Sequence, residues 1–131
     1  MKLGLALLSS TAFLCAAPVA VAQDAVTADS NHYTIESENA EVRVLRIKYG
    51  PHEKGTMYSH PNSVTVFLTD GTLKMATPDG KTRVGTPKAG QVVWEQAGSH
   101  QPENLTDQPF EAVRIELKRQ KATATKQPEQ E

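Results

Sequence analysis

Apolar and polar residues alternate along most of the chain after residue 30, and they rarely recur at the spacing of a helix. Successive side chains of a β-strand point to opposite faces, so a period of two predicts strands. The clearest example is the segment 110–117, which we expect to be a half-buried strand. Its alternation places three apolar residues on one face and three charged residues on the other: Val113, Ile115 and Leu117 against Arg114, Glu116 and Lys118.

Two earlier segments deviate from simple alternation. In residues 42–49 the apolar positions change phase after Val44, which predicts either a β-bulge or a strand that is covered on both faces. Residues 64–68 are more uniformly apolar, so we expect them to lie deep in the protein.

Turn-forming residues separate these segments at short intervals. The best hairpin candidate joins residues 73–76 to residues 82–84 through a turn that contains Pro78, Asp79 and Gly80. Many short strands in about a hundred residues are typical of a sandwich or a barrel. The sequence therefore predicts an all-β domain, a single jelly-roll β-barrel over residues 31–118.

The two ends of the chain differ from this pattern. Lys2, the apolar stretch up to residue 22 and the small residues Ala20 and Ala22 predict a signal peptide over residues 1–22, cleaved after Ala22. This indicates export, to the periplasm or into the medium. Polar residues interrupt the stretch, so a permanent membrane span or an uncleaved anchor is the weaker interpretation. We expect residues 23–30 to be a linker and residues 119–131 a disordered tail.

Composition and charge limit the partners of the protein. The chain has 131 residues, enough for one domain behind the leader, and its formal net charge is −1. Because it has no basic stripe, nucleic-acid binding is excluded as an expectation. The single cysteine, Cys15, lies in the predicted signal peptide, so we expect no disulfide in the mature chain.

Two separated clusters carry the candidate chemistry. The first is Tyr58-Ser59-His60-Pro61, and the second runs from Gly98 through His100 to Asn104. Residues two apart on a strand share a face, so Tyr58 and His60 are expected in one pocket, with His100 reaching it from a distant strand.

This arrangement resembles the cupin family, small β-barrels whose pocket is lined by histidines from two such motifs. In that resemblance His60, Gly71, His100 and Asn104 occupy family positions, whereas Tyr58 stands at the place of a first histidine and Val64 at the place of a glutamate.

The resemblance implies a site with several candidate roles. The expected ligand-binding residues are Tyr58, His60, Trp94 and His100. A divalent metal (Fe, Mn, Ni, Cu or Zn) would take His60 and His100, with His52 and Glu103 as additional ligands, and Tyr58 and Glu103 are the catalytic candidates. The competing interpretation is a pair of pocket histidines hydrogen-bonded to the backbone or to Tyr58, with Trp94 as a packing residue.

Three functions follow from these expectations. The first is an exported protein that binds a small molecule in the barrel pocket without turnover, with or without a metal. The second is a metal-dependent enzyme of the dioxygenase or isomerase type. The third is a structural or assembly role, in which residues 33–36 supply the edge of a homodimer.

Overall fold

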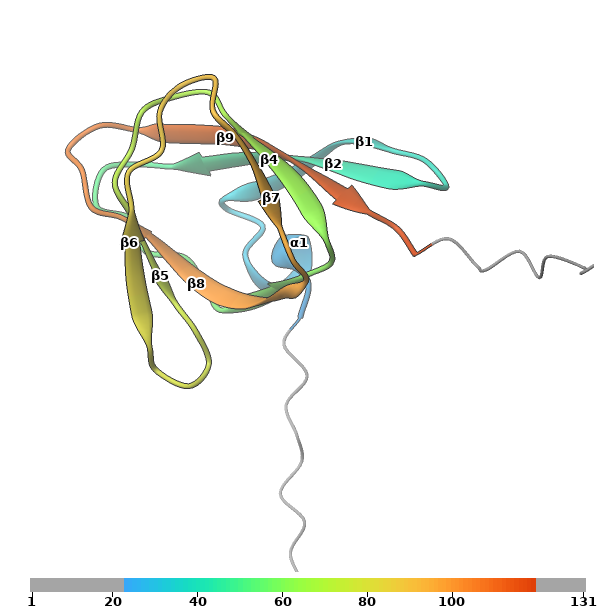
Figure 1. The fold of residues 1–131 in the computed structure, drawn as a ribbon, viewed down its shortest axis with the longest axis horizontal. Coiled ribbons are helices and arrows are strands. Elements are labelled where there is room, and N and C mark those ends of the chain that lie inside the picture. Colours follow the sequence, from blue (N-terminus) through green and yellow to red (C-terminus); the bar gives the residue numbers. More distant parts are fainter. Residues whose placement is uncertain (1–22, 120–131) are drawn as a thin grey trace, which may run out of the picture.

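The computed structural model describes residues 23–119, which form one short helix and nine strands in two antiparallel sheets (Figure 1). The elements are α1 (Ala25–Ala28), β1 (Tyr33–Glu38), β2 (Val42–Tyr49), β3 (Tyr58–His60), β4 (Ser63–Phe67), β5 (Leu73–Ala76), β6 (Thr82–Gly85), β7 (Val92–Glu95), β8 (Gly98–Asn104) and β9 (Phe110–Leu117). The five-stranded sheet has the order β1-β2-β9-β4-β7, and the four-stranded sheet has the order β3-β8-β5-β6. The all-β prediction is confirmed.

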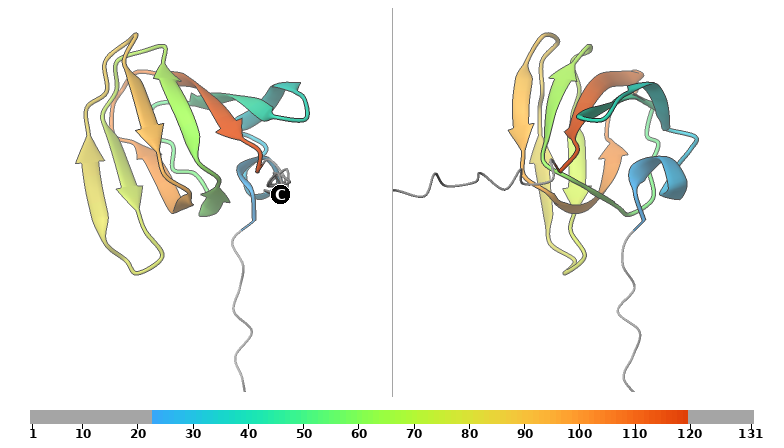
Figure 2. Two further views of the ribbon diagram at one scale, coloured as in Figure 1. Left: turned by 45° about the vertical axis from the view of Figure 1, so that its right-hand side comes forward. Right: turned by 90° about the vertical axis from the view of Figure 1, so that its right-hand side faces the viewer.

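The two sheets face each other and enclose a shared interior, as the rotated views show (Figure 2). The predicted hairpin is present, since β5 and β6 pair antiparallel with Leu73 opposite Gly85 and Ala76 opposite Thr82. Strands β6 and β7 follow each other in the chain but end different sheets. The interior is therefore not closed by strand pairing between β6 and β7.

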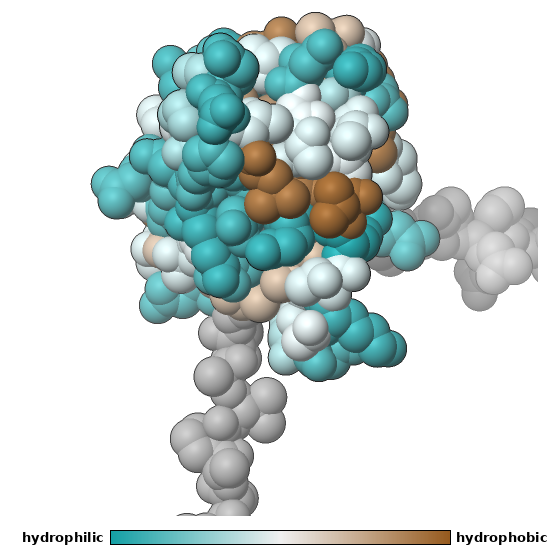
Figure 3. Space-filling view, turned by 90° about the vertical axis from the view of Figure 1, so that its left-hand side faces the viewer, coloured by the Kyte–Doolittle hydropathy of each residue, from teal (hydrophilic) through white to brown (hydrophobic). Residues whose placement is uncertain are grey.

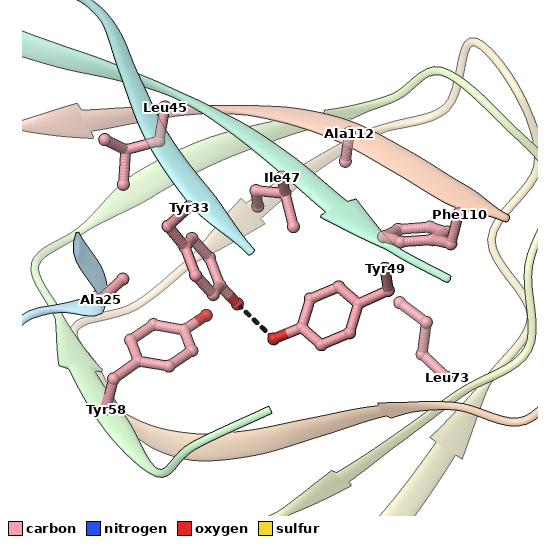
Figure 4. Close-up of a cluster of buried hydrophobic side chains, with 9 residues drawn as sticks. All are labelled: Ala25, Tyr33, Leu45, Ile47, Tyr49, Tyr58, Leu73, Phe110 and Ala112. Carbon is pink, nitrogen blue, oxygen red and sulfur yellow. Dashed lines mark hydrogen bonds between the residues drawn. The ribbon is translucent and has the colours of Figure 1, made fainter. Parts of the chain in front are cut away.

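The apolar core lies between the two sheets and is rich in aromatic residues (Figure 4). Its members are Ala25, Tyr33, Leu45, Ile47, Tyr49, Tyr58, Leu73, Phe110 and Ala112. The Tyr49 hydroxyl donates a hydrogen bond of 3.2 Å to the Tyr33 hydroxyl, so the phenols satisfy their polar ends inside the core. Burying a large apolar side chain stabilises a fold by about 1.5–3 kcal/mol.

Strand β9 buries the opposite face from the one that its apolar residues suggest. Arg114 and Glu116 are 2% exposed, whereas Val113 and Ile115 are only partly buried and Leu117 is exposed. The expectation for residues 64–68 is also wrong, because in β4 the polar residues at 63 and 65 are buried and the valines at 64 and 66 lie on the outer side. The interior of the barrel is therefore lined partly by charged and hydroxyl side chains.

Strand β2 contains no bulge. It pairs with β9 in continuous register from Val42 opposite Leu117 to Tyr49 opposite Phe110, and the irregularity lies in β1 between Ile35 and Ser37. Leu45, Ile47 and Tyr49 are buried on the inner face of β2, whereas Val42 and Val44 on the outer face are only partly buried and Lys48 is exposed, so the outer face is only partly covered.

The segment predicted as a linker, residues 23–30, is folded onto the barrel instead. Asp24 caps α1 by accepting from the Val26 backbone N–H at 3.1 Å, and Ala25 is fully buried in the core. Asp29 accepts from the Thr56 backbone N–H at 2.9 Å and ties the helix to a loop. These contacts give the segment a fixed place, which a linker would not have.

The predicted signal peptide and most of the predicted tail lie outside the described residues. Within residues 23–119, no helix combines the length and hydropathy that a membrane crossing needs.

Candidate functional site

Pairing of β3 with β8 brings the two histidine clusters together. Tyr58 lies directly opposite His100, and His60 lies opposite Gly98. The His60 and His100 rings are 4.8 Å apart between centroids, and each residue is only 6% exposed. Two imidazoles separated by forty positions in the chain thus share one site inside the barrel.

The hydroxyl of Tyr58 connects this pair to a buried cation. Arg114 Nη1 donates to the Tyr58 hydroxyl at 2.6 Å, and the same hydroxyl lies 2.7 Å from His100 Nε2. Because a guanidinium can only donate, the tyrosine oxygen accepts from Arg114, and it shares its second hydrogen bond with His100 Nε2. His60 is held separately, with its Nδ1 at 2.8 Å from the Pro61 carbonyl oxygen.

Arg114 is neutralised by Glu95 from the neighbouring strands. Its Nη2 lies 3.1 Å from Glu95 Oε2, and the Thr65 hydroxyl donates to the same oxygen at 2.8 Å. The Arg114 side chain is 3% exposed and the Glu95 side chain 16% exposed. A buried charge is tolerated only when it is paired and hydrogen-bonded, and this network meets both conditions.

Burial and the Arg114 charge keep both histidines neutral. Burial, followed by the charges of Arg114 and His60, lowers the pKa of His100 to about 3. Burial and then Arg114 also lower the pKa of His60. Burial raises the pKa of Glu95, but the Arg114 charge and the Thr65 hydrogen bond outweigh it, so the net pKa is lowered and the carboxylate stays ionised.

The other residues expected at this site lie elsewhere. His52 is on an exposed loop with its Nε2 2.5 Å from an Asp107 carboxylate oxygen. Glu103 lies on the face of β8 opposite to the buried residues and forms an ion pair of 2.6 Å with Lys74. Trp94 is 54% exposed on β7, between inward-facing neighbours. The structure brings together Tyr58, His60 and His100 but not these three.

The donor set does not fit the metal that the family resemblance implies. Among the described residues, no cluster of three or more His, Cys, Asp or Glu side chains could hold a metal ion. Glu95 is the carboxylate associated with the histidine pair, but it is bound by Arg114 and Thr65. The permanent positive charge of Arg114 also acts on both rings, as their lowered pKa values show, and would oppose a divalent cation there.

A cavity of about 370 Å³ lies between β6 and β7, and Glu95 is one of its lining residues. Its apolar lining residues are Phe67, Leu73, Met75, Val84, Pro87 and Val93, and its polar ones are Arg83, Thr86, Gln91 and Glu95. Glu95 also lines a second, much smaller interior space together with Arg114. Glu95 therefore connects the cavity to the buried network around Tyr58.

Three residues of this network were missed from the sequence: Thr65, Glu95 and Arg114. Each is a polar residue within an alternating strand, a pattern that normally marks the solvent face. The cupin resemblance pointed only to the histidine positions. The available signal was Phe67, an apolar residue on the same face of the strand as Thr65, which leaves Thr65 a candidate for the interior.

The fold and the paired histidines define a double-sheet barrel with an internal polar site, and comparisons agree. No family model matches the chain. It is 34% identical over 87 residues to the β-alanine degradation protein BauB of Pseudomonas aeruginosa. The aligned residues cover 65% of this chain and 90% of that protein.

Solved structures resemble it as well. A cupin domain from Bordetella pertussis superposes with a TM-score of 0.63 at 27% identity, over 66% of this chain and 92% of that one. A cupin 2 conserved barrel domain protein from Salinispora arenicola has the same fold. It superposes with a TM-score of 0.51 at 19% identity, over 81% of this chain and 88% of that one. The chain belongs to the cupin family.

Proposed function

We propose that this protein binds a small organic molecule in the cavity between β6 and β7 without the help of a metal. The observation that carries the proposal is a cavity of about 370 Å³ whose lining combines apolar side chains with the charged carboxylate of Glu95. Known ligand pockets occupy about 300–1,000 Å³ and combine an apolar wall with a few polar groups. The name of the Pseudomonas relative, a β-alanine degradation protein, also supports a small metabolite as the ligand.

The histidine pair has an indirect role in this proposal. The Tyr58 hydroxyl contacts both His100 and Arg114, and Arg114 pairs with Glu95, so the buried network sets the position and charge of a carboxylate that lines the cavity. The metal-dependent enzyme has less support, since no cluster of three or more His, Cys, Asp or Glu side chains among the described residues could hold an ion, and the Arg114 charge lowers the pKa of both histidines.

A pair of adjacent valines offers a direct test. Val93 lines the cavity, whereas Val92 is 61% exposed on the outer side of the same strand. Screening a small-metabolite library by ¹H–¹⁵N NMR should identify compounds that shift signals of cavity residues. Val93→Phe should abolish their binding and Val92→Phe should preserve it. Equal binding by both variants, or no cavity shifts in the unmodified protein, would contradict the proposal.

Export is proposed from the amino-terminal segment alone. Secretion with cleavage after Ala22 would leave Gln23 as the first residue of the mature chain. Intact-mass measurement of the protein from periplasm or medium tests this, and a full-length mass confined to the cytoplasm would rule it out.

A homodimer is also proposed, through the outer face of the five-stranded sheet. Cross-strand pairing aligns Trp94, Val64, Ile115 and Val44 in one row on four neighbouring strands. The charges at its edge are already neutralised, because Arg46 pairs with Glu36 and Glu111. A second copy of the same face suits this neutral, apolar row, since identical patches meet in a two-fold dimer.

Light scattering after size-exclusion chromatography measures this directly. Trp94→Glu should convert a dimer to a monomer, whereas Val84→Glu, an equally exposed position on the other sheet, should not. A monomeric unmodified protein at 100 micromolar, on the order of the concentration used for NMR, would contradict the dimer.

A further inference from the structure

The cavity between β6 and β7 is apolar except for a few positions, and two of its lining residues carry opposite charges. Arg83 lies on β6 and Glu95 on β7, the two edge strands that border the cavity. The side of the molecule that carries β5 and β6 is mostly hydrophilic, with a compact hydrophobic cluster near its centre (Figure 3).

Glu95 presents one saturated oxygen and one free oxygen. Oε2 accepts from both Thr65 and Arg114, while Oε1 makes no hydrogen bond or ion pair among residues 23–119. The carboxylate is ionised, so Oε1 can only accept. A donor group in the cavity, and most favourably a cationic one, matches this oxygen.

Arg83 has no carboxylate partner within the part of the chain that the structure describes. Three other arginines, by contrast, are all ion-paired: Arg43, Arg46 and Arg114. Arg83 and Glu95 line the same cavity yet form no ion pair with each other. A guanidinium of this kind binds a carboxylate through two parallel hydrogen bonds.

We infer that the ligand is a short aliphatic zwitterion, with an ammonium group at Glu95 Oε1 and a carboxylate at Arg83. This inference rests on the proposed function and names the chemical class of its ligand. The apolar wall contributed by Phe67, Met75 and Val93 contacts the methylene groups between the two charges. An ω-amino acid has this layout.

Charge balance favours a zwitterion over a singly charged molecule. A simple carboxylate would satisfy Arg83 but bring a negative charge toward Glu95, and a simple amine would leave Arg83 unpaired. A zwitterion satisfies both groups and adds no net charge to the site. Discrimination of this kind comes from the unpaired charge that the wrong ligand leaves behind.

The test compares matched ligands by NMR titration of the full mature chain. The series is glycine, 3-aminopropanoate, 4-aminobutanoate and 5-aminopentanoate, set against butanoate, butylamine and butanol. One zwitterion of the series should bind in the cavity about tenfold or more tightly than any singly charged or neutral compound, which corresponds to one lost charge pair of about 1.4 kcal/mol.

Arg83→Gln provides the deciding variant, since Arg83 is exposed and makes no internal ion pair that folding would miss. It should weaken the best zwitterion about tenfold and leave the affinity for butylamine unchanged or stronger. Lys81→Gln, an 87% exposed position close in sequence, controls for a general loss of positive charge and should have no effect.

The failure of this inference differs from the failure of the proposed function. Cavity binding of butanol or butanoate as tight as that of every zwitterion would overturn the ligand class and leave small-molecule binding intact. An unchanged zwitterion affinity in Arg83→Gln would do the same. Absence of cavity shifts with any compound, including the metabolite library, would overturn both.

Discussion

Arg114 and Tyr58 meet at 2.6 Å in the interior of the barrel, and this contact joins the histidine pair to the charged lining of the cavity. The guanidinium carbon also lies 5.4 Å from the centre of the Tyr58 ring. The tyrosine that replaces a family histidine is therefore the hydrogen-bonding partner of an internal cation.

Removal of the Tyr58 hydroxyl should be costly. Tyr58→Phe leaves Arg114 Nη1 and His100 Nε2 without this partner, and each lost bond in a buried site costs about 1–3 kcal/mol. Urea denaturation should show a drop in unfolding free energy of about 2–6 kcal/mol, the sum over the two bonds. Tyr49→Phe, which removes one bond of 3.2 Å to Tyr33, is the control and should cost less. Equal losses of unfolding free energy in the two variants would mean that the contact of Tyr58 with Arg114 contributes no more to stability than the Tyr49–Tyr33 bond does.

Arg114 and Glu95 should depend on each other. Arg114→Met leaves the Glu95 carboxylate largely buried and unpaired, so we expect a loss of about 3–5 kcal/mol. The double variant Arg114→Met/Glu95→Gln should recover part of that loss. Arg46→Met, at a more exposed pair, should cost much less. Additive effects of the two internal changes would show that they are not coupled.

The histidines should make the fold acid-sensitive. Since the pKa of His100 falls to about 3 in the folded protein and lies near 6.5 when unfolded, the unfolded chain binds more protons between these values. Stability should therefore be complete above pH 6.5 and decrease by about 1.4 kcal/mol per pH unit below it for this residue alone, with His60 adding to the slope.

His100→Gln tests that slope between pH 6.5 and 5. The variant should lose less stability on acidification than the unmodified protein does. His52→Gln, in which an exposed loop histidine is replaced, should retain the original slope. If all three proteins lose stability in parallel, protonation of His100 is not the cause.

Two hydroxyls on β4 should behave in opposite ways. Ser63 Oγ is buried and has no hydrogen-bond partner among the described residues, whereas Thr65 donates to Glu95. Ser63→Ala should be neutral or stabilise by up to about 1 kcal/mol, and Thr65→Val should destabilise by about 1.5–3 kcal/mol. Thermal denaturation of the two variants gives the comparison, and the reverse order would contradict this account of the strand.

Metal affinity should rise when the internal cation is removed. Titration calorimetry with Zn²⁺ should show weak binding to the unmodified protein and stronger binding to Arg114→Met, which frees Glu95 beside two neutral imidazoles. Elemental analysis of untagged protein provides a second readout. Near-stoichiometric metal that disappears in His60→Ala would show that Arg114 does not exclude a cation.

The sequence predicted the strands and the meeting of His60 with His100, because turn residues and period-two alternation are local signals. It did not predict which face of β9 is buried. Arg114 and Glu116 alternate with Val113 and Ile115, and this pattern suggests that the apolar face is buried, whereas the charged residues are the buried ones. Only the pairing partners decide the matter, since the interior supplies Glu95 and Tyr58 to Arg114, and these come from strands distant in the chain.

The helix residues 25–28 were missed for a similar reason. A single turn is too short to show periodicity, and its fixed position depends on Asp24 and on contacts of Asp29 with the loop at Thr56. Trp94 was assigned to the pocket from its residue type, although its place on β7 directs it outward while Val93 and Glu95 face the cavity.

The backbone carbonyl of Gln23 accepts a hydrogen bond of 2.9 Å from the N–H of Ser59, the middle residue of β3. A fusion partner or purification tag joined directly to Gln23 would disturb this hydrogen bond and therefore the strand that carries Tyr58 and His60. Recombinant proteins should therefore carry a tag after residue 119, or a tag joined through a spacer ahead of residue 23. Either design keeps the hydrogen bond between Gln23 and Ser59.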